Sequence, residues 1–281
     1  MLRHIAVGLF AGAVMSAVTP ASAQTPAERG GYLVNTLMTC NNCHTPIGPQ
    51  GPDFSKALSG GLTFDEPPFK VTASNITPDP DTGIGKWTDA QIKMLLRKGT
   101  RPDGTNVAPI MPTGFYEILT DKDVDAIVAY LRTVKPVKNE TPAPVYKMAF
   151  KRDIPPGAEK PMPEADLSNP VKKGFYLATA AHCMECHTPM DKGAHDFKRL
   201  GAGGTEFPGP WGKSVSRNIT SSKAKGLGDW TDDEIKRAIT QGVHKDGSKL
   251  KPPMGYPFYA RMTPDDLNAV VAYLRTVPAV E

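Results

Sequence analysis

A five-residue pattern, Cys-x-x-Cys-His, occurs at Cys40 to His44 and again 143 residues later at Cys183 to His187. Two thiols in this spacing with an adjacent imidazole are the attachment signature of a c-type haem. The thiols add across the two vinyl groups of the porphyrin, and the histidine is held where it must approach the iron. The sequence therefore predicts two covalently bound haem c groups, attached through Cys40, Cys43, Cys183 and Cys186, with His44 and His187 as proximal iron ligands.

Other uses of cysteine agree less well with this pattern. All four cysteines of the chain lie in the two motifs. In an exported protein they would otherwise form two disulfides, and a single Cys-x-x-Cys would suit a thioredoxin-like redox pair. A zinc site would place its two Cys-x-x-Cys halves about 15–20 residues apart. The histidine that directly follows both copies favours haem over each of these readings.

The 143-residue offset extends far beyond the motifs and indicates an internal repeat. It superimposes Asn75-Ile76-Thr77 on Asn218-Ile219-Thr220, Trp87 on Trp230, and Phe115-Tyr116 on Phe258-Tyr259. We therefore expect two homologous domains in tandem, each of ordinary size. We call residues 24–137 the first repeat, residues 168–281 the second repeat, and residues 138–167, which contain six prolines, the linker. Such a proline-rich segment should run extended and stiff.

The periodicity within each repeat predicts helices. A short helix is expected before each motif, around Gly31-Tyr32-Leu33 and Gly174-Phe175-Tyr176. A second begins at Thr88 or Thr231, each of which opens a capping box, and a third begins at Thr120 or Thr263 with one apolar face. No alternating strand pattern of useful length is found. The expected fold class is all-α, with small helices wrapped around each haem.

A second axial ligand for each iron is expected from methionine. We compared every methionine of the expected mature chain with the residue at the repeat offset, and only Met111 and Met254 pair with each other. Both lie 67 residues after the motif histidine in proline-rich loops. A rigid loop suits a thioether that must be held against iron, because methionine is otherwise a flexible side chain. The alternative is that both methionines merely fill gaps in the core.

The first 23 residues predict an export signal. A short basic start at Arg3 and His4 precedes an apolar run, and Ala21-Ser22-Ala23 supplies a small-residue cleavage site. The run is too short and too weakly apolar for a spanning helix, which needs about 20 apolar residues, and no other stretch approaches that length. We therefore expect a mature chain without a transmembrane segment, located in the periplasm. Nothing in the sequence suggests nucleic-acid binding.

The order of these motifs resembles a known family. Cys-x-x-Cys-His, paired glycines, Asn-Ile-Thr-Pro-Asp from Asn75, Gly-x-Gly-x-Trp-Thr-Asp from Gly83, a methionine, and Ala-Ile-Val-Ala-Tyr-Leu-Arg from Ala126 follow one another. They are similar to the multihaem cytochrome c subunits of bacterial periplasmic dehydrogenases that oxidise alcohols, aldehydes, gluconate or nicotinate. The resemblance implies two class I cytochrome c folds with His/Met iron. It also implies a catalytic dehydrogenase subunit and a downstream electron acceptor as partners.

These expectations favour electron relay over catalysis, because His/Met ligation fills both axial positions and leaves substrate no open site. The first alternative is a di-haem enzyme of the peroxidase or thiosulfate-oxidising type, which would need two unlike haems. The second alternative is a free-standing periplasmic electron shuttle. Of the net charge of +4, residues 24–137 contribute −1, residues 168–281 contribute +4 and Arg3 contributes the remaining +1. The mildly basic second repeat suits an acidic redox partner, or is an ordinary solvated surface.

Overall fold

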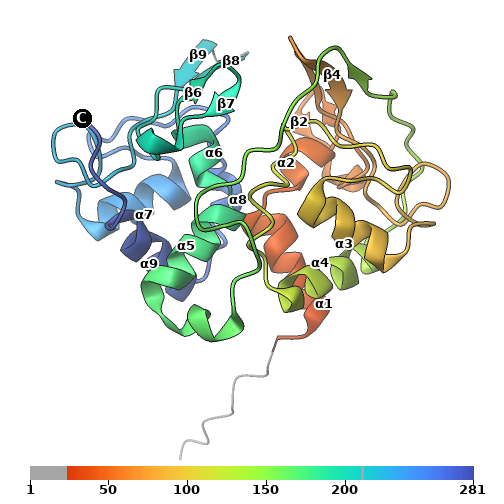
Figure 1. The fold of residues 1–281 in the computed structure, drawn as a ribbon, viewed down its shortest axis with the longest axis horizontal. Coiled ribbons are helices and arrows are strands. Elements are labelled where there is room, and N and C mark those ends of the chain that lie inside the picture. Colours follow the sequence, from red (N-terminus) through yellow and green to blue (C-terminus); the bar gives the residue numbers. More distant parts are fainter. Residues whose placement is uncertain (1–23, 210–211) are drawn as a thin grey trace, which may run out of the picture.

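The computed structural model describes residues 24–209 and 212–281. The predicted export signal, residues 1–23, lies outside the described residues. The two repeats form two lobes that lie side by side, and the linker runs between and over them (Figure 1). No helix among the described residues combines the length and apolar character that crossing a bilayer requires.

The helices of the first repeat begin where their capping residues predict. Thr25, Thr88 and Thr120 are N-caps, and the Thr88 hydroxyl accepts from the Gln91 amide while the Gln91 side chain accepts from the Thr88 amide. This reciprocal pair satisfies two amides that a helix start leaves without partners. The elements are α1 (Pro26–Tyr32), the π-helix η1 (Leu33–Leu37), α2 (Asn41–His44), the 3₁₀ helix η2 (Phe54–Lys56), α3 (Asp89–Lys98) and α4 (Asp121–Thr133).

The second repeat follows the same plan. Thr231 and Glu234 form the capping box of the helix that corresponds to α3, and Thr263 caps the last helix. The elements are the 3₁₀ helix η3 (Glu164–Ser168) at the end of the linker, α5 (Pro170–Ala180), α6 (Cys183–His187), the 3₁₀ helix η4 (Phe197–Arg199), α7 (Asp232–Gln241), α8 (Tyr256–Tyr259) and α9 (Pro264–Leu274).

The chain is mostly helical, but the expectation of an all-α fold is confirmed only to this extent, because the chain also contains small antiparallel sheets. Each is a hairpin of two- or four-residue strands, too short to leave an alternating pattern in the sequence. A strand of the linker joins one of them, with Phe69 opposite Tyr146 and Lys70 opposite Val145. The sheets are β1 (Ile47–Gly48) with β2 (Gly51–Pro52); β3 (Thr63–Glu66) with β4 (Phe69–Thr72) and β5 (Val145–Tyr146); β6 (Met190–Asp191) with β7 (Ala194–His195); and β8 (Glu206–Gly209) with β9 (Gly212–Val215).

The first and last helices of each repeat cross at a glycine. A Cβ added to Gly30 would lie 1.9 Å from the carbonyl oxygen of Ala126, and one added to Gly174 would lie 1.9 Å from that of Ala269. Only glycine allows the backbones to approach so closely. Gly30 and Gly174 are therefore equivalent, and the expected match of Gly31 with Gly174 is wrong by one residue.

Between its helix-crossing glycine and its Cys-x-x-Cys-His motif, the first repeat has one residue more than the second, and this extra residue coincides with the π-helix. Ten positions separate Gly30 from Cys40, but nine separate Gly174 from Cys183. The surplus falls in the segment that contains η1, Leu33–Leu37, whereas α5 is a continuous α-helix. A π-bulge absorbs one inserted residue while the helix continues, so both repeats present their motifs in the same way.

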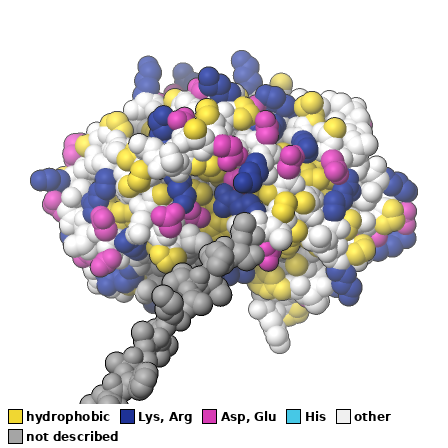
Figure 2. All heavy atoms as spheres, turned by 90° about the horizontal axis from the view of Figure 1, so that it is seen from below, with side chains coloured by type: hydrophobic (Ala, Val, Ile, Leu, Met, Phe, Trp, Pro, Cys, Tyr) yellow, Lys and Arg dark blue, Asp and Glu magenta, His cyan; other side chains and the backbone are white. Residues whose placement is uncertain are grey.

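The apolar cores of the repeats are continuous. Leu33 and Ile127 from the first repeat, Ala158 from the linker, and Leu177 and Val271 from the second belong to one buried cluster. On the surface, basic and acidic side chains are interspersed over the face that Figure 2 shows. The shared core gives the two repeats a fixed contact instead of a flexible tether.

Two tyrosine hydroxyls fasten the repeats to each other in a reciprocal arrangement. Tyr32 donates to Asp266 at 2.7 Å and accepts from the Thr263 amide at 3.3 Å. Tyr176 donates to Asp123 at 2.6 Å and accepts from the Thr120 amide at 3.3 Å. Each tyrosine thus caps the first turn of the last helix of the other repeat, and the contact has approximate twofold symmetry.

Candidate functional site

The two Cys-x-x-Cys-His motifs lie on the short helices α2 and α6. Their cysteines are free thiols that are partly buried, and no disulfide joins them. Two side chains three residues apart on a helix point to the same side. The paired thiols are therefore presented together, as attachment to two neighbouring vinyl groups requires. Burial raises the pKa of Cys40 to about 12 and that of Cys43 to about 11.

Each motif histidine is oriented by one backbone carbonyl. Nδ1 of His44 lies 2.6 Å from the carbonyl oxygen of Ser74, and Nδ1 of His187 lies 2.7 Å from that of Arg217. Since a carbonyl only accepts, Nδ1 carries the proton and Nε2 keeps its lone pair. This tautomer is the one that binds a metal through Nε2, and such a hydrogen bond is the usual support of a ligating histidine.

The loop that carries each carbonyl is braced by an asparagine. Oδ1 of Asn75 accepts from the amide of Thr77 at 2.9 Å and from its hydroxyl at 2.7 Å. Oδ1 of Asn218 does the same with Thr220, at 2.9 and 2.6 Å. These asparagine turns fix the backbone directly after Ser74 and Arg217. The two Asn-Ile-Thr sequences therefore brace the loops whose carbonyls contact the motif histidines, which we call the histidine-supporting loops.

The environment of His44 and His187 favours the neutral form of the imidazole, which is the form that binds a metal. Burial lowers the pKa of His44 and of His187 below the ordinary value of 6.5, although the hydrogen bond to the carbonyl opposes that effect. A metal-binding imidazole must be deprotonated at the ligating nitrogen. Burial and tautomer together therefore favour iron binding.

The candidate methionine ligands lie in equivalent loops. Met111 is half-buried and packs against the shared core, with its amide donating to the carbonyl of Ala108 at 3.0 Å. Met254 is half-buried in the loop before α8. Their role as axial ligands stays a prediction.

Two buried tyrosines near the motifs were not assigned a role from the sequence. Tyr116 is 2% exposed and Tyr259 is 7% exposed. Tyr259 donates to the carbonyl of Ala181 at 3.0 Å. Burial raises the pKa of both hydroxyls, and the motif cysteines of the same repeat add to the effect. The sequence signal that could have identified these tyrosines is their equivalent position in the two repeats, in the matched pairs Phe115-Tyr116 and Phe258-Tyr259.

The structure brings the two motifs together at His182. Nδ1 of His182 lies 2.8 Å from Oε2 of Glu185, and Nε2 lies 3.3 Å from the carbonyl oxygen of Met38 in the other repeat. Glu185 also raises the pKa of Cys43, after burial, which is the larger cause. The acidic side chain of the second motif is thus close to both attachment sites.

A second histidine, His195, fastens the linker to the second motif. Its Nδ1 and its amide contact Oδ2 of Asp153 at 2.7 and 2.9 Å, and its Nε2 contacts the carbonyl oxygen of Glu185 at 2.8 Å. The adjacent Arg152 binds Glu117 of the first repeat at 2.5 Å. Two consecutive linker residues therefore each bind a different repeat: Arg152 binds the first and Asp153 binds the second.

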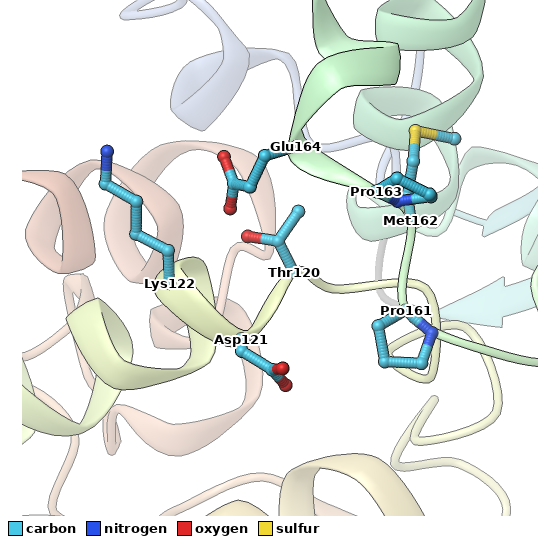
Figure 3. A pocket seen from close by; sticks show the side chains of 7 residues that line it. All are labelled: Thr120, Asp121, Lys122, Pro161, Met162, Pro163 and Glu164. Atoms are coloured by element: carbon cyan, nitrogen blue, oxygen red, sulfur yellow. The ribbon is translucent and has the colours of Figure 1, made fainter.

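A pocket of about 460 Å³ lies apart from these residues, between the start of α4 and linker residues 161–164 (Figure 3). None of the motif residues lines it. Among the described residues, no group of three or more His, Cys, Asp or Glu side chains could hold a bare metal ion.

The residues present fit a haem c in each repeat. Each repeat offers paired thiols on one side of a short helix, a neutral imidazole with its Nε2 available, and a half-buried thioether in a matched loop. The supporting contacts are equivalent in the two repeats, from Ser74 and Arg217 to Asn75 and Asn218.

Comparisons with known proteins agree with this chemistry. The family model described as Cytochrome c matches residues 27–135 and again residues 171–278. The "Alcohol dehydrogenase (quinone), cytochrome c subunit" of Gluconobacter oxydans is 30% identical over 296 residues, with 98% of this chain and 59% of the relative covered. The "Fructose dehydrogenase cytochrome subunit" of Gluconobacter japonicus is 32% identical, with 93% of this chain and 54% of the relative covered.

A "Diheme cytochrome c-type" protein of Cereibacter sphaeroides is 33% identical over 255 residues, which cover 86% of this chain and 83% of that relative. By contrast, the chain spans less than two thirds of the length of both dehydrogenase subunits.

Proposed function

This chain belongs to the cytochrome c family, which confirms the resemblance found in its sequence, and from that premise we propose that it relays electrons from a dehydrogenase towards a respiratory chain. The proposal rests above all on one observation. Ser74 and Arg217 hold His44 and His187 in the same tautomer and at nearly the same distance. Two matched sites suit a carrier that passes electrons through both.

We assign two haem c groups to the chain, one in each of two class I cytochrome c domains, residues 24–137 and 168–281, joined by the proline-rich linker. Haem c supplies a one-electron carrier. Cys40, Cys43, Cys183 and Cys186 would hold it covalently, His44 and His187 would bind the iron on one side, and Met111 and Met254 would bind it on the other. Thioether ligation opposite histidine raises the reduction potential, which suits an acceptor of electrons from a dehydrogenase.

The protein residues contribute orientation and exclusion of water. The Ser74 and Arg217 carbonyls keep the proton on Nδ1, so Nε2 of each histidine would be available to bind the iron. The buried Tyr116 and Tyr259 close the space near the motif cysteines. A closed, apolar surrounding limits reorganisation of solvent when the charge of a redox centre changes.

A catalytic subunit that oxidises a small substrate is the proposed electron donor. This follows from the names of the two relatives that are cytochrome subunits of an alcohol dehydrogenase and a fructose dehydrogenase. We place the protein in the periplasm on the basis of the export signal in residues 1–23. The match over most of a diheme cytochrome supports the second candidate, a free-standing shuttle.

A combined experiment tests the proposal. A pyridine haemochrome assay on the matured protein should give two haem c groups per chain, and a redox titration should show both reduced by a donor dehydrogenase. The isolated protein should turn over neither peroxide nor thiosulfate at enzyme-like rates. Fast turnover of either substrate, or rapid binding of cyanide to one haem, would reject the relay and favour a di-haem enzyme.

A further inference from the structure

The segment that follows Met254 is held by the first repeat. It continues into α8, which lies at the boundary between the two lobes and contacts η1 of the first repeat (Figure 1). Gly255 lies against Thr39, and a Cβ added to the glycine would be 3.6 Å from Cγ2 of that threonine. Two residues after the end of α8, Arg261 donates to the carbonyl oxygen of Asn35 at 2.6 Å. The segment thus contacts the first repeat at both of its ends.

The π-helix makes the Asn35 carbonyl available to Arg261. Asn35 lies in the last turn of η1, where the carbonyls of a helix lack partners within it. The equivalent residue of the second repeat is Thr179, which precedes its motif by one residue fewer. Its carbonyl accepts from the amide of His182 at 2.8 Å, within its own repeat. The extra residue of the first repeat therefore frees a carbonyl that the second repeat uses internally.

The bond from Arg261 to Asn35 has no counterpart on the other side of the interface. In the first repeat Ile118 stands at the place of Arg261, and its side chain cannot donate. The carbonyl of Ile118 instead accepts from the amide of Met162 in the linker at 2.9 Å. The tyrosine contacts between the repeats are reciprocal, whereas this one departs from the twofold symmetry.

The linker holds the corresponding segment of the first repeat. A Cβ added to Gly114, three residues after Met111, would lie 1.9 Å from the carbonyl oxygen of Asp153. Arg152 binds the Glu117 carboxylate at 2.5 Å, and the side chain of Glu117 is only 4% exposed. The segment after one candidate methionine is therefore fixed by the linker, and the segment after the other is fixed by the opposite repeat.

We propose that Arg261 is a positioning residue for Met254 and acts through its hydrogen bond to Asn35. Methionine is a flexible side chain, so the hold on its thioether depends on how firmly the surrounding segment is fixed. Ligation of the second iron would then depend on the contact between the repeats, and ligation of the first iron would depend on the linker. This inference rests on the assignment of Met254 as an axial ligand under the proposed function.

Imidazole added to the haem-loaded ferric protein tests the proposal, because it competes with a thioether for ferric iron. It should displace a loosely held methionine at a lower concentration. Each site is observed alone in a variant that removes the other candidate ligand. In the Met111→Ala protein the remaining charge-transfer absorption reports on Met254, and in the Met254→Ala protein it reports on Met111. The imidazole concentration that removes half of this absorption is measured in each.

Arg261→Gln is expected to lower this imidazole concentration about three- to tenfold at the Met254 site, as the loss of one ordinary hydrogen bond predicts. The Met111 site should not change. Arg261→Lys keeps a charged donor and should restore most of the difference. Arg152→Gln is the matched change in the linker and should affect the Met111 site but not the Met254 site.

Equal effects of Arg261→Gln at both sites, or no effect at the Met254 site, would overturn the proposal. Failure of the underlying ligand assignment has a different signature. The Met254→Ala protein would then keep the full charge-transfer absorption before any imidazole is added, which would overturn the assignment and the positioning with it.

Discussion

Oγ1 of Thr39 lies 3.5 Å from Nε2 of His182, and each of these residues directly precedes the first cysteine of an attachment motif. Both have a left-handed backbone, with φ of 48° and 44°. Such a conformation is uncommon outside glycine and persists only where surrounding contacts impose it. The two motifs therefore meet at one defined contact between the repeats, and the separation of the two motifs is set by packing instead of by linker length.

Replacement of His182 by threonine, the residue at the equivalent place in the first repeat, is expected to lower both midpoint potentials. Hydrogen bonding to Glu185 raises the pKa of His182, although burial opposes it. Without this cationic partner, the Glu185 carboxylate favours the oxidised, more positive iron of both sites, by an amount on the order of tens of millivolts. A spectroscopic redox titration measures the shift.

The matched control for that change is Thr39→Val, which keeps the side-chain shape and leaves the ion pair intact. If His182→Thr and Thr39→Val shift the potentials equally, then packing at the contact, and not the charge of His182, sets them.

Met111→Ala and Met254→Ala should each remove half of the charge-transfer absorption that arises from methionine-ligated ferric haem. Each should also lower the potential of one haem, because loss of the thioether removes the ligand that favours reduced iron. Met94→Ala is the control, since Met94 is 51% exposed on α3 and is not duplicated in the second repeat. A methionine whose replacement leaves both signals unchanged is not an axial ligand.

Tyr176→Phe should destabilise the protein more than Tyr32→Phe. Tyr176 is 1% exposed, so its loss leaves the Thr120 amide without its side-chain partner and removes one hydrogen bond from Asp123, which Arg29 still binds. The expected cost is about 1–3 kcal/mol, and that of Tyr32→Phe is smaller because Tyr32 is only partly buried. Denaturant unfolding followed by circular dichroism measures both. Equal costs would show that burial does not control the strength of these two contacts.

The local signals of the sequence predicted the helices well. The capping boxes at Thr88 and Thr231 and the helix starts at Thr120 and Thr263 are confirmed, because each depends on residues within one turn. The repeated Asn-Ile-Thr sequence pairs the two histidine-supporting loops, but their contact with the motif histidines was found only in the structure.

Features that depend on distant contacts were missed. His195 finds its partner Asp153 across 42 residues, in a linker without a counterpart in the repeat pattern. The register of the first helices was wrong by one because Gly30 and Gly31 are adjacent, and only the close approach of Ala126 identifies which one corresponds to Gly174.

The pair of His195 and Asp153 should give the protein a pH-dependent stability. Hydrogen bonding to Asp153 raises the pKa of His195 above 6.5, although burial opposes it. The contact with His195 lowers the pKa of Asp153 below 3.8, again against the effect of burial. The histidine therefore contributes stability that is full below pH 6.5 and is lost as pH rises through its folded pKa. The aspartate contributes stability that is full above pH 3.8 and is lost as pH falls through its folded pKa.

The coupling free energy between the two residues should thus be largest between pH 3.8 and 6.5 and should decline towards pH 8. A double-mutant cycle of His195→Gln, Asp153→Asn and the combined variant isolates it, because the titration of all other groups cancels. Within that window we expect about 1 kcal/mol, since the pair is only partly buried. A coupling that stays constant from pH 4 to pH 8 would mean that His195 holds Asp153 as a neutral hydrogen-bond donor at every pH in that range.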